Sequence, residues 1–80
     1  MSNEQTHPLH STDKEIIDSL ITKEIPEDLD YINLARLINR YSNFHGEIEI
    51  KNDIEKILNF WNINKNELFF KTKTIWSKSF

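Results

Sequence analysis

The sequence of 80 residues contains no cysteine, and it has only one glycine, Gly46, and two prolines. Without cysteine the chain cannot form disulfides, thiolate metal sites or a cysteine nucleophile. So little glycine and proline argues against a β-sandwich, whose many turns need both residues. No apolar run approaches the roughly 18–20 residues of a membrane span, and residues 1–10 lack the apolar centre of a signal peptide. We therefore expect a cytoplasmic protein with no membrane partner.

Sequence signatures of catalysis and of cofactor binding are also missing. No serine lies in a nucleophile elbow, and no glycine-rich loop is present to cradle a phosphate. A chain of 80 residues has room for one modest core and rarely for a sheltered active site as well. We therefore expect a protein that is not an enzyme and that carries no cofactor.

Charge is unevenly distributed along the chain, whose net charge is −3. Residues 1–30 carry eight acids against two lysines, and residues 65–80 carry four lysines against one acid. The two ends can attract one another within the fold or across a dimer, or the basic end can bind an acidic partner. The first interpretation is favoured, because surface charge in a small domain is usually only solvated.

Apolar residues at helical spacing predict four short helices. We expect them at residues 13–24, from a cap at Asp28 or Asp30 to about Tyr41, at about 48–61 and at about 65–76, after a mobile tail over residues 1–11. The chain is thus predicted to be all-α, a compact four-helix bundle that forms a single domain over residues 12–80.

Polar residues at the ends of these helices support the boundaries. Thr12 with Glu15, and Asn64 with Glu67, have the spacing of reciprocal helix caps. Gly46 falls in a polar break, where a positive φ angle is expected, and Asn62 can adopt the left-handed conformation that ends a helix.

A β-ribbon is the alternative for two segments. Residues 47–51 alternate with period two, and residues 69–76 are rich in β-forming residues. The run from Ile50 to Trp61 has helical periodicity, and a lone two-stranded hairpin is only marginally stable. Helices are therefore favoured in both places.

The predicted core consists of the apolar faces of the second, third and fourth helices. Trp61 ends the stripe of the third helix, so we expect its ring against the second and fourth helices. The core members are Leu34, Leu37, Tyr41, Ile54, Ile57, Leu58, Trp61, Leu68 and Trp76.

Arg36 and Arg40 lie one turn apart on the polar side of the second predicted helix. Their guanidinium groups can together grip the carboxylate or phosphate of an external anion. The alternative is an internal ion pair between one arginine and Asp53, which lies at the edge of the third helix's stripe. The internal pair is favoured.

On a helical projection, Phe70 falls nearly opposite the apolar stripe of the fourth predicted helix. Lys71 and Lys73 lie on either side of it. An aromatic ring bordered by cations has the composition of an interface anchor, in which the ring fills a pocket and the lysines steer approach. We take these three residues as candidates for binding another protein. A homodimer is compatible with this pattern.

Two further kinds of site have weaker support. The third and fourth helices, over residues 50–76, have the arrangement of a helix-turn-helix, which is the nucleic-acid-binding alternative. The negative net charge disfavours it, because DNA affinity rests largely on neutralising phosphates. His7 and His10, followed by Asp13, have the spacing of a metal-binding pair, but zinc needs three or four convergent ligands on a rigid frame. We therefore predict no metal site.

Residues spread over nearly the whole chain carry a resemblance to a known family. They are Gln5-Thr6-His7-Pro8-Leu9, Thr12-Asp13, Ile17-Asp18, Leu34-Ala35-Arg36-Leu37, Arg40-Tyr41, Phe44, Gly46, Ile50, Asp53, Leu58, Trp61, Glu67-Leu68-Phe69, Lys71-Thr72 and Ile75. The pattern resembles a family of small cyanobacterial proteins classed as a domain of unknown function, and it departs from that family at His45, Asn62 and Phe70. The resemblance implies a cyanobacterial source and a soluble helical fold, and it implies no activity.

These observations predict a non-catalytic protein-binding module, acting as an accessory or regulatory factor of a cyanobacterial cell. The prediction rests partly on elimination, because no catalytic set or cofactor motif is present. Its positive support is the position of Phe70 among lysines and the separation of charge along the chain.

Overall fold

The computed structural model describes residues 7–79, which form four helices and no strand. They are α1 (His10–Leu20), α2 (Asp28–Tyr41), α3 (Ile48–Phe60) and α4 (Lys65–Ser79). The all-α prediction is confirmed. The β-ribbon alternative is wrong, because residues 48–51 belong to α3 and residues 69–76 belong to α4.

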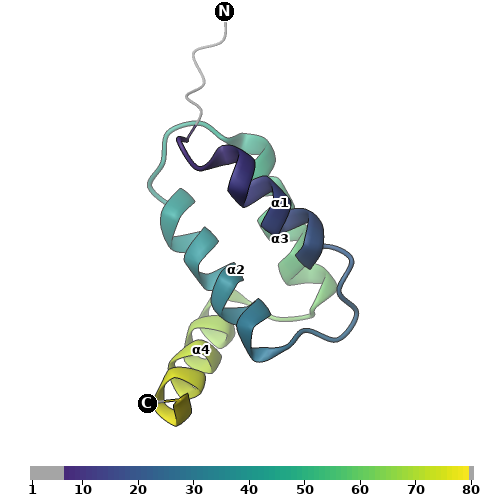
Figure 1. Ribbon diagram of the computed structural model, residues 1–80, viewed down its shortest axis with the longest axis vertical. Coiled ribbons are helices and arrows are strands. Elements are labelled where there is room, and N and C mark those ends of the chain that lie inside the picture. Colours follow the sequence, from purple (N-terminus) through teal and green to yellow (C-terminus); the bar gives the residue numbers. More distant parts are fainter. Residues whose placement is uncertain (1–6, 80) are drawn as a thin grey trace, which may run out of the picture.

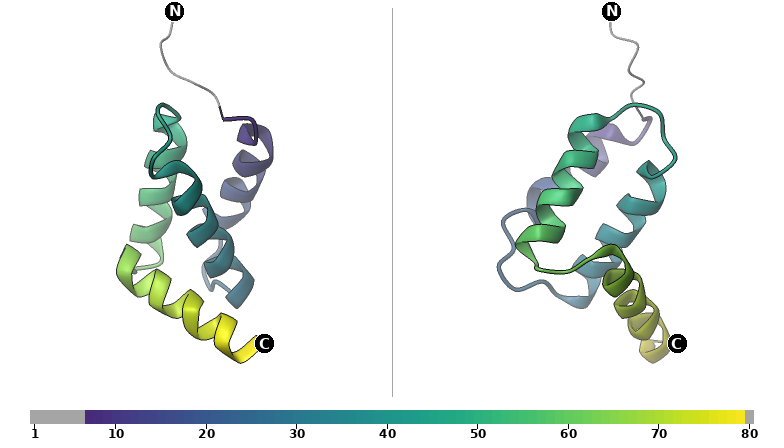
Figure 2. Two further views of the ribbon diagram at one scale, coloured as in Figure 1. Left: turned by 90° about the vertical axis from the view of Figure 1, so that its left-hand side faces the viewer. Right: turned by 180° about the vertical axis from the view of Figure 1, so that it is seen from behind.

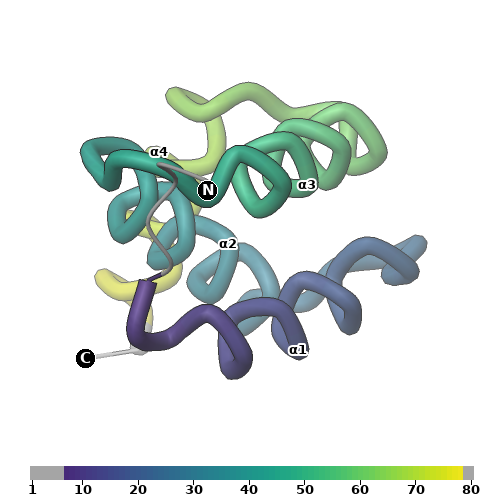
Figure 3. Tube along the Cα trace, turned by 90° about the horizontal axis from the view of Figure 1, so that it is seen from above, coloured from purple at the N-terminus to yellow at the C-terminus, as the bar shows by residue number. Residues whose placement is uncertain are grey.

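Three of the helices form a body, and the fourth packs across one end of it. α1, α2 and α3 contact one another in all three pairs, and Figure 3 shows them grouped side by side. α4 packs against α2 and runs obliquely at the end of the molecule opposite the start of α1 (Figures 1 and 2). A helix with one main neighbour buries one stripe of its surface, so the other faces of α4 meet solvent.

The start of α1 is earlier than predicted. The His7 carbonyl accepts the N–H of His10 at 3.0 Å, and the Leu9 carbonyl accepts that of Asp13 at 2.8 Å, so helical hydrogen bonding begins before Thr12. Thr12 therefore lies inside the helix and not at its cap. Of the tail predicted over residues 1–11, His10 and the next residue are helical, and residues 1–6 lie outside the described residues.

α1 also ends earlier than predicted, at Leu20 instead of residue 24. The chain turns at Lys23, whose carbonyl accepts the indole N–H of Trp61 at 3.2 Å. The Lys23 ammonium lies 3.2 Å from Asp30 Oδ2. These two contacts tie the α1–α2 connection to α2 and to the end of α3.

The predicted turns and the cap of α4 are confirmed. Gly46 has φ 107° and Asn62 has φ 54°, so both residues have the expected positive φ angle. Asn64 Oδ1 accepts the Glu67 N–H at 2.8 Å, and Glu67 Oε1 accepts the Asn64 N–H at 3.2 Å, which is the reciprocal cap. Glu47 also has φ 54°, which the sequence did not indicate.

The core agrees with the prediction apart from its two tryptophans. Trp61 is half-buried, and its ring meets Tyr31 of α2 edge-on at 5.4 Å between centroids. Trp76 is 43% exposed, so its assignment to the core is wrong. It lies beside the stripe that α4 buries, and α2 cannot cover both. The buried apolar residues are Ile17, Leu20, Leu34, Ala35, Leu37, Ile38, Tyr41, Ile50, Ile54, Ile57, Leu58, Leu68 and Ile75.

Substitutions on α4 test which of its sides is buried. Leu68 has no accessible surface, so Leu68→Ala should lower the free energy of unfolding by about 2–5 kcal/mol, as for other buried leucines. Trp76→Ala should cost clearly less, although it removes a larger side chain. Urea unfolding followed by circular dichroism measures both, and a larger loss for Trp76→Ala would contradict this packing.

Candidate functional site

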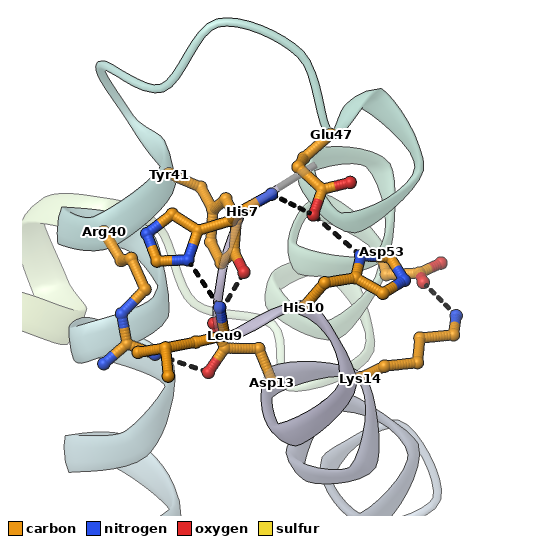
Figure 4. A network of polar contacts seen from close by, with 9 residues as sticks. All are labelled: His7, Leu9, His10, Asp13, Lys14, Arg40, Tyr41, Glu47 and Asp53. Atoms are coloured by element: carbon orange, nitrogen blue, oxygen red, sulfur yellow. Dashed lines mark hydrogen bonds and ion pairs between the residues drawn. The ribbon is translucent and has the colours of Figure 1, made fainter. Parts of the chain in front are cut away.

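A buried carboxylate, that of Asp13, joins α1 to α2 (Figure 4). The Tyr41 hydroxyl donates a hydrogen bond of 2.6 Å to its Oδ2, and the Arg40 guanidinium pairs with its Oδ1. Burial raises the pKa of the Tyr41 hydroxyl above its ordinary value, and the hydrogen bond to Asp13 raises it further. Because water does not reach the carboxylate, these two donors replace the hydrogen bonds that solvent would make.

Asp53 pairs with Lys14, so the predicted ion pair between Asp53 and Arg36 or Arg40 is wrong. Lys14 Nζ donates to Asp53 Oδ2 at 3.0 Å, and this hydrogen bond raises the pKa of the Lys14 ammonium. Arg40 is engaged by Asp13. Arg36 is exposed and forms no ion pair with any residue that the structure describes. An external anion would therefore meet Arg36 without a second free guanidinium beside it.

Glu47 fixes the residues that precede α1 to the start of α3. Its buried carboxylate accepts a hydrogen bond from the backbone N–H of His7 at 3.2 Å and another from His10 Nδ1 at 2.7 Å. The His7 ring lies at an angle to Tyr41 and Phe44, with centroid distances of 5.1 and 4.9 Å. Both histidines thus have protein partners, and no three metal-ligating side chains are grouped among residues 7–79.

The polar network is closed within the described part of the chain. There, every buried side-chain nitrogen and oxygen has a hydrogen-bond partner. The buried atoms of this network are directed at one another. The arrangement therefore works as a structural joint between α1, α2 and α3.

Phe70 lies on the side of α4 opposite the buried stripe, as predicted, and it is 74% exposed. The stripe itself is formed by Leu68, Thr72 and Ile75. An open depression of about 640 Å³ adjoins the ring, and it is lined by Ile63, Asn66, Glu67, Phe70, Lys71 and Thr74. The exposed ring and this depression form the Phe70 face.

The two lysines next to Phe70 have different surroundings. Lys71 Nζ lies 4.7 Å from the centroid of the Tyr31 ring, a cation–π contact that links α4 to α2. Lys73 is exposed and forms no ion pair within residues 7–79. Lys71 therefore holds the helix in place as well as bordering the depression, whereas the charge of Lys73 faces solvent.

The comparison with known proteins places the chain among proteins without an assigned role. Residues 4–79 match a family described as a protein of unknown function, DUF3288. The chain belongs to this family. No curated protein and no solved structure matches it. The family match spans all four helices, so the closed network and the Phe70 face both lie within the DUF3288 domain.

None of the described helices combines the length and the apolar character that crossing a membrane requires.

The sequence did not lead us to predict that Asp13 of this DUF3288 domain is buried and paired with Arg40 and Tyr41. Asp13 precedes Ile17 by four residues and Leu20 by seven, so it lies on the apolar stripe of α1. A charged residue on such a stripe must find a partner, and this spacing could have identified it. Nothing in the sequence indicated that Arg40 and Tyr41 would be that partner.

The joint can be tested by neutralising its central charge. Asp13→Asn keeps the shape of the side chain but leaves Arg40 without its carboxylate, so the free energy of unfolding should fall by roughly 3 kcal/mol. The matched control is Asp18→Asn, an exposed position on the same helix, which should change it by less than about 0.5 kcal/mol. Equal effects in urea unfolding would contradict a buried joint.

Alkaline pH should weaken the fold through Tyr41. Its pKa is raised in the folded chain, so its contribution is complete below the ordinary tyrosine pKa of about 10. Above that pH the unfolded chain releases the proton while the folded chain retains it, and the free energy of unfolding falls. The raised pKa of Lys14 acts in the same direction.

The measurement is the free energy of unfolding against pH for the wild type and Tyr41→Phe. The variant lacks the hydroxyl, so its stability should decrease less steeply above about pH 10. Parallel curves for the two proteins would show that Tyr41 does not have a raised pKa.

Proposed function

We propose that this protein is a non-catalytic protein-binding module that binds its partner through the Phe70 face. The observation that carries the proposal is the 74% exposure of Phe70 on a helix whose opposite side is buried. A phenylalanine gains free energy when a partner removes its ring from water. On the other side of the fold, the polar residues of the joint are already satisfied within the chain.

The charge around the Phe70 face favours a partner with acidic groups. Residues 65–80 carry four lysines and one glutamate. Lys73 and Lys78 are exposed and would attract carboxylates during approach. The partner should therefore offer an apolar contact for the ring together with carboxylates for the lysines.

The same charges argue against the nucleic-acid alternative. Lys65 lies 3.5 Å from Glu55, and Lys71 contacts the Tyr31 ring, so two of the four lysines have intrachain partners. The net charge of the chain is −3, and binding to DNA or RNA depends on neutralising many phosphates.

The cellular setting is part of the proposal. The resemblance to small cyanobacterial proteins supports a cyanobacterial source, and we infer an accessory or regulatory role in the cytoplasm. A small domain with an exposed aromatic anchor is suited to modulating a larger protein by binding to it.

The experiment uses Phe70→Ala with a matched aromatic control. Phe60 is 54% exposed, but it ends α3 and does not line the depression. The wild type, Phe70→Ala and Phe60→Ala are immobilised on separate beads at equal density. Each is then incubated with a nuclease-treated cyanobacterial lysate. A protein partner should be retained by the wild type and by Phe60→Ala and lost from Phe70→Ala.

The retained partner is then purified and its dissociation constant measured against all three chains. Phe70→Ala should raise the constant by about tenfold or more, while urea unfolding stays within about 0.5 kcal/mol of wild type. A partner bound equally well by Phe70→Ala would refute the proposal. A ligand that is retained from an untreated lysate but not from the nuclease-treated one would favour the nucleic-acid alternative.

A further inference from the structure

We propose that the partner on the Phe70 face is a second copy of this chain. In this two-fold symmetric dimer, α4 of each protomer meets residues 24–29 of the other, a segment that we call the acidic corner. The inference rests on the proposed protein-binding function and names the partner for it. The acidic corner comprises Glu24, Ile25, Pro26, Glu27, Asp28 and Leu29.

The acidic corner has the chemistry that the Phe70 face requires of a partner. Ile25 is 83% exposed and Leu29 is 63% exposed, although both are large apolar side chains. Three exposed acids lie between and beside them, namely Glu24, Glu27 and Asp28. The segment therefore offers apolar contacts for Phe70 and carboxylates for the lysines of α4.

The corner is held in one conformation, which lowers the entropy cost of binding. Lys23, just before it, is bonded through its carbonyl to Trp61 and through its ammonium to Asp30. The backbone N–H of Glu27 donates to Asp30 Oδ2 at 2.8 Å. Pro26 fixes a further backbone angle between these anchors. The exposed Ile25 is thus presented on a fixed turn.

Several charged residues on the two surfaces form no ion pair within the described part of the chain. Glu24 and Asp28 form no ion pair within residues 7–79, and neither do Lys73 and Lys78. A pairing of the corner with α4 across a dimer would bring these charges together. Under two-fold symmetry each such pairing occurs twice, so one pair of complementary surfaces on the chain is sufficient.

The arrangement of the helices places both surfaces at one end of the molecule. The acidic corner leads into α2, which is the helix that α4 packs against. In Figure 1 the start of α2 and the whole of α4 lie at the lower end, opposite the start of α1. A dimer contact of ordinary size covers about 800 Å² of each protomer, roughly one seventh of the 5720 Å² that this chain exposes. A dimer contact at this end would need to cover about that share of the surface.

The test is sedimentation of the purified chain from micromolar to millimolar concentration at low and high salt. The wild type should form a reversible dimer that salt weakens, because the surface charges are screened. Phe70→Ala should raise the dimer dissociation constant by about tenfold or more. Ile48→Ala is the control, since Ile48 is also exposed but opens α3 at the opposite end.

Charge reversal identifies the surfaces that meet. One variant carries Lys73→Glu and Lys78→Glu, and the other carries Glu24→Lys and Asp28→Lys. Each should be monomeric alone, because like charges then face one another at both contacts. An equimolar mixture should dimerise, because each contact regains opposite charges. Circular dichroism verifies that both variants are folded.

Three results would overturn the inference: a monomeric wild type at all concentrations, a dimer that ignores Phe70→Ala, or a mixture that stays monomeric. Its failure is separable from that of the proposed function. A monomeric chain that still captures a different protein through Phe70 would refute the dimer and leave the proposed function standing. A dimer unaffected by Phe70→Ala, together with no Phe70-dependent capture, would refute both.

Discussion

The fold depends on one buried charge, the carboxylate of Asp13. It has no contact with solvent, and it is neutralised by Arg40 and hydrogen-bonded by Tyr41, both from the end of α2. A buried carboxylate without such partners would cost several kcal/mol, so α1 can pack only where these two donors meet it. This requirement fixes the position of α1 on α2, and Lys14 then reaches Asp53 on α3.

Polar and apolar side chains consequently have different roles at the two ends of the molecule. Near the N-terminus, charged and histidine side chains are paired with one another and hold three helices together (Figure 4). At the other end, α4 is held by one apolar stripe and by the Lys71 contact with Tyr31. The first region is closed, and the second leaves Phe70 in solvent. This exposed ring is the basis of the proposal that the Phe70 face binds another protein.

The sequence predicts the helices well and their tertiary partners poorly, for a physical reason. Helical periodicity and caps are local, so α2, α3, α4 and the Asn64–Glu67 cap follow from neighbouring residues. The partner of Arg40 is Asp13, 27 residues away, and the sequence favoured the wrong acid, Asp53. Trp76 is apolar and adjacent to the buried stripe, yet whether it is covered depends on how many helices surround α4. Glu47 likewise has hydrogen bonds to His7 and His10, which are 40 and 37 residues away, so no local pattern indicates them.

We infer that Asp13, Arg40 and Tyr41 stabilise the fold together, as one joint between α1 and α2. A double-mutant cycle tests this inference, with urea unfolding of the wild type, Asp13→Ala, Tyr41→Phe and the double variant. Alanine is used because the amide oxygen of an asparagine could still accept the Tyr41 hydrogen bond. Because the two side chains share a buried hydrogen bond of 2.6 Å, we expect a coupling energy of about 1–3 kcal/mol. Additive effects, with a coupling energy near zero, would show that the hydrogen bond between Asp13 and Tyr41 does not stabilise the fold, and would contradict the joint.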